Sequence, residues 1–107
     1  MAAALRFTIE FAPETVDHLA AIASKYHRLI RETVVRQLRF APDAPTRNRK
    51  LLEPPTPFGA TWELRFGPGN RFRVFYEIDP EEQHVWILAI GVKERNRSFF
   101  AGEEFDL

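Results

Sequence analysis

Residues Trp62–Val92 contain three runs rich in apolar residues, and these runs decide the fold. They are Trp62–Phe66 (WELRF), Arg71–Ile78 (RFRVFYEI) and Val85–Val92 (VWILAIGV). Apolar and polar residues alternate in the first two runs, as they do in strands with one buried and one exposed face. The third run is apolar at every position, which is typical of a central strand covered on both faces. The stretch therefore predicts a three-stranded antiparallel meander.

The alternation also predicts how the first two strands pair. Their apolar residues share one face only if the connecting loop has an odd number of residues, because a shift by one residue reverses every side chain. We expect a three-residue loop, Pro68–Asn70, ending in a left-handed conformation that Asn tolerates. On this register two or three guanidinium groups lie within cross-strand reach of one another. The face directed away from the helices then carries Glu63, Arg65, Arg71, Arg73, Phe75 and Glu77.

The chain before the meander predicts one strand and two helices. Residues 5–11 alternate between apolar and polar, and Pro13 suits the first turn of a helix. A second helix is expected from Lys25 to about Phe40, with Ser24 as its N-cap; one continuous helix is the alternative. The element order is β-α-α-β-β-β. The predicted fold class is thus α+β, with two N-terminal helices packed on a twisted, mainly antiparallel sheet.

Two segments outside these elements carry further cations. Residues 44–59 form a proline-rich polar connection, which is either a functional loop or a solvated loop tip. The segment that follows the central strand leads to Phe99 and Phe100, which either pack a short terminal helix onto the sheet or leave an aromatic ring exposed. The cations of these segments are Arg47, Arg49, Lys50, Lys93, Arg95 and Arg97.

Composition restricts the classes of protein to consider. A chain of 107 residues is expected to form a single domain, 1–107. It has no cysteine and only three widely spaced histidines, so neither a disulfide nor a metal site is expected. No apolar run reaches the roughly 20 residues of a membrane span, which predicts a cytoplasmic protein with no membrane partner. The net charge is zero, but bases cluster in residues 28–50, and a local basic surface can still bind a polyanion.

Fixed cations on a sheet are the chemistry that the sequence favours. Arginine binds phosphate oxygens bidentately and keeps its charge, so Arg65, Arg73 and Lys93 are candidates to stabilise a phosphate in a transition state. RNA supplies its own nucleophile, the ribose 2′-hydroxyl. Glu63 has two candidate roles, as a general base or as a cross-strand ion pair with Arg71 or Arg73.

The segments Trp62–Arg65, Arg71–Tyr76 and Ile90–Arg95 resemble the RelE/ParE superfamily of type II toxins. The resemblance implies a toxin domain over nearly the whole chain, bound by a cognate antitoxin and without a cofactor. It places Arg65, Arg73 and Lys93 at catalytic positions, with Glu63 beside them. The surrounding cations Arg47, Arg49, Lys50, Arg71, Arg95 and Arg97 are assigned to RNA binding.

Two positions depart from the RelE pattern. Glu63 stands where that branch has a lysine, and Phe99 lies near the position of its catalytic tyrosine. A glutamate in this motif is closer to the HigB-like branch. The RelE/HigB-like branch implies a metal-independent, ribosome-dependent mRNA endonuclease that arrests translation, with the ribosome and mRNA as partners. The alternatives are a ParE-like inhibitor of DNA gyrase and an inactive homologue that only binds antitoxin; a homodimer is also left open.

Overall fold

The computed structural model describes residues 6–106, whose strands form one sheet of seven strands. The sheet order is β2-β3-β4-β5-β6-β7, and β1 pairs in parallel with β5. Three short 3-10 turns lie at Ser24–Tyr26, Pro57–Gly59 and Pro68–Asn70. The helices and strands are β1 (Thr8–Phe11), α1 (Thr15–Ala20), α2 (His27–Leu38), β2 (Arg49–Leu51), β3 (Trp62–Phe66), β4 (Phe72–Asp79), β5 (His84–Glu94), β6 (Arg97–Phe100) and β7 (Glu103–Phe105).

The predicted meander and α+β class are confirmed. β3, β4 and β5 pair antiparallel in sequence order. Leu64 faces Val74 and Arg65 faces Arg73, which is the register that the alternation predicts. The turn between them ends at Asn70 in the left-handed region (φ 54°). The hydrophobic pattern therefore fixed which side chains share a face.

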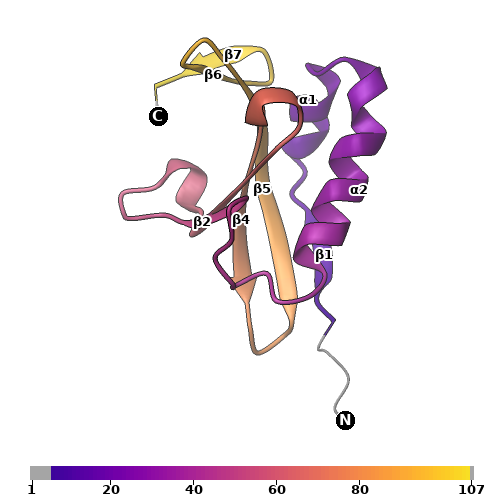
Figure 1. Cartoon of the computed structure of the whole chain (residues 1–107), viewed down its shortest axis with the longest axis vertical. Helices are drawn as coiled ribbons and strands as arrows, with labels where there is room; N and C mark the ends of the chain where they lie inside the picture. The colour runs from indigo at the N-terminus through magenta and orange to yellow at the C-terminus, as the bar shows by residue number, and fades with distance from the viewer. Residues whose placement is uncertain (1–5, 107) are drawn as a thin grey trace.

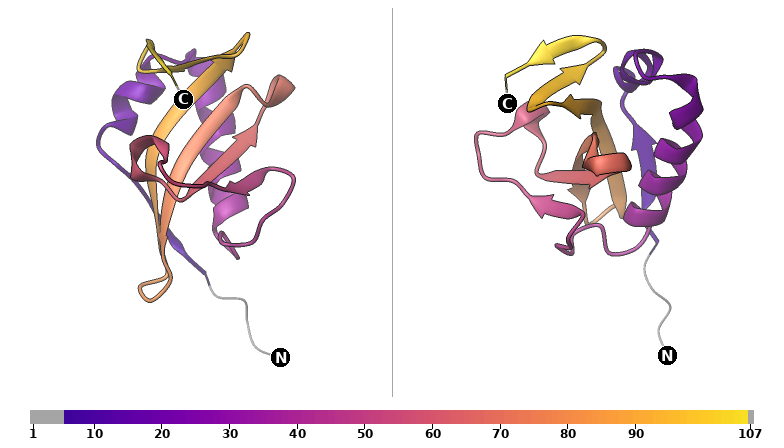
Figure 2. Two further views of the ribbon diagram at one scale, coloured as in Figure 1. Left: turned by 90° about the vertical axis from the view of Figure 1, so that its left-hand side faces the viewer. Right: turned by 45° about the horizontal axis from the view of Figure 1, so that its top comes forward.

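Both helices cover the same face of this sheet (Figures 1 and 2). Ile30, Val34 and Leu38 recur at helical spacing along α2 and are fully buried against the apolar face of the meander. Burying each such side chain contributes roughly 1.5–3 kcal/mol. The opposite face is left free of helices, and Figure 2 (left) looks onto it.

The helical region differs in detail from the prediction. The chain forms two separate helices, because Ala23 takes an extended conformation between them (φ −52°, ψ 133°). Ser24 begins a 3-10 turn, and its side chain caps neither that turn nor α2. No helix within residues 6–106 is long and apolar enough to cross a membrane.

The C-terminal segment forms the hairpin β6–β7 instead of a short helix. The hairpin folds Phe100 onto the helix-free face, where a second small core contains Ala60, Phe75, Ala89 and Phe100. Gly91 makes this approach possible, since a Cβ there would lie 2.4 Å from the Phe100 ring. Phe40, just after α2, is 43% exposed, with the Arg6 guanidinium 5.9 Å from its ring centre.

One edge of β5 is shared by three partners. β1 pairs with His84–Ile87, and β6 pairs with Val92–Glu94. Between these stretches the backbone N–H of Ile90 donates to Nδ1 of His18 (3.1 Å), a buried contact from α1. His18 thus satisfies a strand amide that neither neighbouring strand reaches.

Candidate functional site

A cavity of about 940 Å³ lies on the helix-free face of the sheet. Its lining residues come from β2 and the connection after it, from β3 to β5, and from the β6–β7 hairpin with the residues beside it. Its charged lining includes Lys50, Glu63, Arg65, Arg73, Lys93 and Arg97. All four residues proposed as catalytic from the sequence therefore line one cavity.

Strand pairing explains this convergence. Arg65 and Arg73 are direct cross-strand partners, and Glu63 lies two residues from Arg65 on the same face. Lys50 lies directly opposite Glu63 on β2. Lys93 comes from β5 and pairs with Ser98 of β6; its side chain forms no ion pair with any residue of 6–106.

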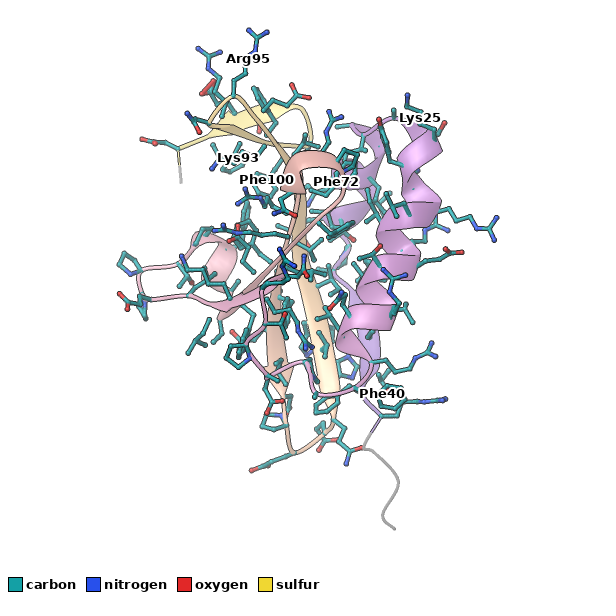
Figure 3. The ribbon with its side chains drawn as sticks, in the orientation of Figure 1. Lys25, Phe40, Phe72, Lys93, Arg95 and Phe100 are labelled. Carbon is teal, nitrogen blue, oxygen red and sulfur yellow. The ribbon has the colours of Figure 1, made fainter. Side chains whose placement is uncertain are left out.

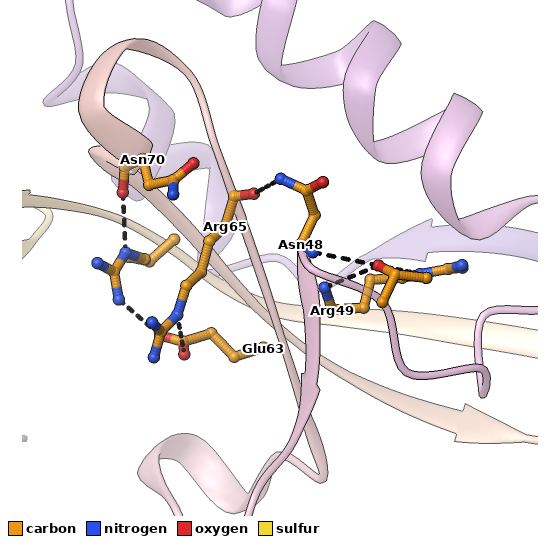
Figure 4. A network of polar contacts seen from close by, with 7 residues as sticks. Asn48, Arg49, Glu63, Arg65 and Asn70 are labelled. Carbon is orange, nitrogen blue, oxygen red and sulfur yellow. Dashed lines mark hydrogen bonds and ion pairs between the residues drawn. The ribbon is translucent and has the colours of Figure 1, made fainter.

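Glu63 is held between the two arginines (Figure 4). Nε of Arg65 donates to Oε1 of Glu63 at 2.8 Å, and Nη1 of Arg73 donates to Oε2 at 3.4 Å. The Glu63 side chain is only 8% exposed, against 13% for Arg73 and 37% for Arg65. Both carboxylate oxygens are therefore hydrogen-bonded. Of the two roles considered for Glu63, the structure shows the ion pair, and it is made with Arg73 and also with Arg65.

Two asparagines that were not proposed as site residues hold Arg65 and Arg73, the pair of arginines that we call the fork. The backbone carbonyl of Asn70 accepts a bond from Nε of Arg73 at 3.0 Å. Asn48 bonds the backbone of Arg65 twice, through its carbonyl (2.8 Å) and through Nδ2 (2.9 Å). The sequence predicted the left-handed turn conformation of Asn70. It did not predict the hydrogen bond between the Asn70 carbonyl and Arg73, because that bond depends on how the chain folds back after the turn.

The cavity is close to charge balance. Its lining holds five cations and four acids, the acids being Glu53, Glu63, Glu104 and Asp106. The acids come from the proline-rich connection, β3 and the C-terminal hairpin. A surface of this kind favours a ligand that makes several specific contacts over one attracted only by net charge.

Of the surrounding cations assigned to RNA binding, only Lys50 and Arg97 reach this cavity. Nη1 of Arg49 donates to the carbonyls of Gln37 and Ala41, at 2.8 and 2.9 Å, and so ties β2 to the end of α2. Arg47 is exposed in a separate hollow beside β2. Arg95 lies at the outer tip of the β5–β6 turn (Figure 3).

The expectation that Arg71 faces away from the helices is wrong. Arg71 precedes β4 in a helical conformation (φ −71°, ψ −26°), so the strand alternation does not extend to it. Its guanidinium lies 5.6 Å from the ring centre of Tyr26 and bonds Glu94 at 2.8 Å. Arg71 therefore lines a smaller pocket on the helix side, of about 360 Å³.

No tyrosine hydroxyl lies in the cavity lining. Phe99 lines the helix-side pocket instead. Tyr26 packs edge-on against Phe72 on that same side. Tyr76 is fully buried and donates its hydroxyl to the carbonyl of Pro42 at 2.8 Å; burial raises the pKa of this phenol. Within residues 6–106, no group of three or more His, Cys, Asp or Glu is placed to hold a metal ion.

Comparison with known proteins agrees with this architecture. A family model described as the ParE toxin of the type II toxin-antitoxin system parDE matches residues 9–97. A search of curated protein sequences found no match. The fold is similar to a chain of the toxin-antitoxin complex RelBE2 from Mycobacterium tuberculosis, with a TM-score of 0.68 and 22% identity, covering 83% of this chain and 93% of that one.

The family match covers most of the chain, including β1, both helices and the whole meander with its Glu63–Arg65–Arg73 fork. Together with the shared fold, it shows that this chain is a type II toxin and belongs to the ParE toxin family of the RelE/ParE superfamily.

Proposed function

We propose that this toxin is a metal-independent endoribonuclease that cuts mRNA on the ribosome and so arrests translation. The observation that carries the proposal is the convergence of Arg65, Arg73 and Lys93 from three adjacent strands on one open cavity. Lys50 and Arg97 extend the same surface toward a longer polyanion.

The proposed chemistry uses groups that RNA itself provides. The 2′-hydroxyl loses its proton to water and attacks the adjacent phosphate, and the bond to the 5′-oxygen of the next nucleotide breaks. The 5′-oxygen takes up a proton from water, which leaves a cyclic phosphate and a free 5′-hydroxyl. The two guanidiniums and the Lys93 ammonium offset the extra negative charge of the pentacoordinate phosphate. Preorganised charges of this kind are usually the largest single contribution to catalysis.

The proposed protein partner is a cognate antitoxin. The chain belongs to a toxin family, and the RelBE2 structure that it resembles is a toxin-antitoxin complex. The free toxin leaves large apolar side chains exposed, among them Val16, Leu29 and Leu51. An antitoxin segment that covers such side chains would gain the free energy of burying them.

Induction in bacteria followed by primer extension on a tracked message tests the nuclease proposal. We expect discrete cleavage of translated mRNA, together with growth arrest. Arg73→Ala should relieve toxicity far more than Arg36→Ala, which removes the same charge from the exposed surface of α2. Growth arrest with intact mRNA would contradict the proposal, and equal relief by both variants would assign the activity to the helix surface.

A second candidate is inhibition of DNA gyrase without nuclease activity. It is favoured by the engagement of both Glu63 oxygens, because a carboxylate bonded to both arginines is not free to act as a base. On this alternative, induction causes a DNA-damage response while translation continues. Harmless expression without antitoxin would instead indicate an inactive homologue that serves only as an antitoxin partner.

A further inference from the structure

We propose that Arg65 and Arg73 form a phosphate-binding fork whose resident occupant is the carboxylate of Glu63. An RNA phosphate must displace this carboxylate, so Glu63 acts as a built-in competitor that weakens the binding of phosphates lacking further contacts. The inference deepens the proposed function, because it concerns the affinity and selectivity of the same cavity.

The first argument is chemical equivalence. A carboxylate and a phosphodiester each carry one negative charge spread over two exposed oxygens, and guanidinium groups bind both in the same geometry. The Glu63 carboxylate bridges guanidiniums from adjacent strands, one oxygen to each. A site that holds this anion has the spacing and donors to hold the other.

The second argument is that contacts other than Glu63 also hold the two arginines. Nε of Arg73 is anchored by the Asn70 carbonyl, and Asn48 holds the backbone of Arg65 from β2. The other guanidinium N–H groups of both arginines have no acceptor among residues 6–106. The Arg73 guanidinium and the Arg65 backbone therefore stay anchored when the carboxylate moves away, and both guanidiniums have further N–H donors for a phosphate.

The third argument is the asymmetry of the two contacts. Charge-assisted N–H···O bonds have a usual length of about 2.7–2.9 Å. The bond from Arg65 meets this range at 2.8 Å, whereas the contact from Arg73 is 3.4 Å. Arg73 is therefore the arginine whose hold on Glu63 is weaker, and a phosphate gains most by replacing the carboxylate there.

When a phosphate replaces the Glu63 carboxylate, the fork exchanges one anion for another, so the fork alone contributes little net free energy of binding. Productive binding then requires the contacts of Lys50, Lys93 and Arg97 around it. A continuous RNA strand supplies neighbouring phosphates for these cations, whereas an isolated phosphate does not. The competitor thus favours RNA over small phosphate compounds.

The test compares Glu63→Gln with Glu104→Gln. Both variants remove one negative charge from the same cavity, but the ion pair of Glu104 with Arg97 is long, 3.9 Å, and lies at an exposed site. The probe is a short fluorescent single-stranded RNA with 2′-O-methyl groups, which the proposed chemistry does not cleave. We expect Glu63→Gln to tighten binding by roughly tenfold, because like-charge repulsion at the fork is relieved, and Glu104→Gln by less than about twofold.

Inorganic diphosphate, measured in parallel, identifies the source of the phosphate. A larger gain for diphosphate than for RNA supports the inference as stated, because the competitor weakens most the binding of a phosphate that has no further contacts. An equal or larger gain for RNA would overturn the RNA selectivity assigned to Glu63. Unchanged or weaker RNA binding by Glu63→Gln would overturn the competitor role and leave Glu63 as a positioning residue for the arginines.

A measurement on the unaltered protein covers the case in which the variant does not fold. In ¹⁵N NMR, the Nε–H signal of Arg65, which reports its bond to Glu63, should shift on titration with the uncleavable RNA. A signal that stays fixed while RNA binds would contradict displacement. The nuclease proposal has its separate test in primer extension, so failure of either proposal can be recognised without the other.

Discussion

Arg65 and Arg73 differ from the other cations of this chain in what holds them. Both guanidiniums bond the Glu63 carboxylate, the Asn70 carbonyl also accepts a bond from Arg73, and Asn48 holds the backbone of Arg65. Exposed cations such as Arg47 and Arg95 instead lie alone in loops or turns. Side-chain entropy opposes the ordering of a free arginine on a ligand. Arg65 and Arg73 have met this cost during folding, which is why we assign the phosphate contact to them.

At the same scale, His18 makes folding sensitive to pH. Its Nδ1 accepts the N–H of Ile90, so the imidazole has to be neutral in the folded protein. Burial lowers the His18 pKa below its usual value of 6.5, and this effect exceeds the opposite influences of Asp17 and Glu14. The unfolded chain therefore takes up the proton first as pH falls.

We expect the free energy of unfolding to be highest above pH 6.5 and to decrease as pH falls below that value. Thermal unfolding measured on both sides of it checks the prediction. His18→Asn is the control, because its amide oxygen keeps an acceptor near the Nδ1 position but does not titrate. An equal pH dependence in that variant would attribute the effect to other groups.

At the scale of elements, β2 decides which basic side chains reach the cavity. Its residues pair with β3, and side chains alternate along it, so Lys50 lies on the cavity face with Glu63 while Arg49 lies on the helix side with Leu64. The strand is only three residues long and sits inside a proline-rich connection. Without its pairing, Arg49 and Lys50 are equivalent members of one basic run.

We expect Arg49→Ala to destabilise the fold by about 1.5–3 kcal/mol, because it removes charge-assisted bonds to two carbonyls at the end of α2. Binding of RNA by the protein that remains folded should be unchanged. Denaturant unfolding and anisotropy measure the two effects. The control is Arg47→Ala, two residues earlier in the same segment, which should change the free energy of unfolding by less than about 0.5 kcal/mol.

A loss of RNA affinity in Arg49→Ala without a loss of stability would reverse this assignment. It would return Arg49 to the RNA-binding role that the sequence suggested.

At the scale of the whole molecule, net charge and cavity charge both indicate weak long-range attraction to RNA. The formal net charge is zero, and the cavity lining holds five cations and four acids. Binding from free solution then depends on short-range contacts. A larger particle such as the ribosome is well suited to deliver RNA to such a site, since it restricts the strand before the toxin engages it.

We expect the affinity for free single-stranded RNA to fall moderately with salt, with a log–log slope of roughly −2 to −3, since three or four phosphates are contacted and each neutralised phosphate contributes about −0.7. Titrations across a range of salt concentrations measure this slope. A slope steeper than about −4 would mean that the basic surface of α2 also takes part. The Arg36→Ala variant would then reduce the slope, and Glu104→Gln would not.

The sequence by itself determined the fold class, the toxin superfamily and the meander register. Apolar alternation is a local property that sets which residues face a core, and a one-residue shift would expose every apolar side chain. The same alternation placed Glu63, Arg65 and Arg73 on one face. It failed at Arg71 because the strand begins one residue later.

Only the tertiary structure decided how those charges are used. The binding of one carboxylate by two arginines and the split between Arg49 and Lys50 depend on contacts between segments distant in sequence. So does the C-terminal segment, which brings Arg97, Glu104 and Asp106 to the cavity. Side-chain ion pairs are set by distances of a few ångströms after the strands have twisted and packed. A pattern along the chain records the face of a residue, but the partner that it meets there is a property of the assembled sheet.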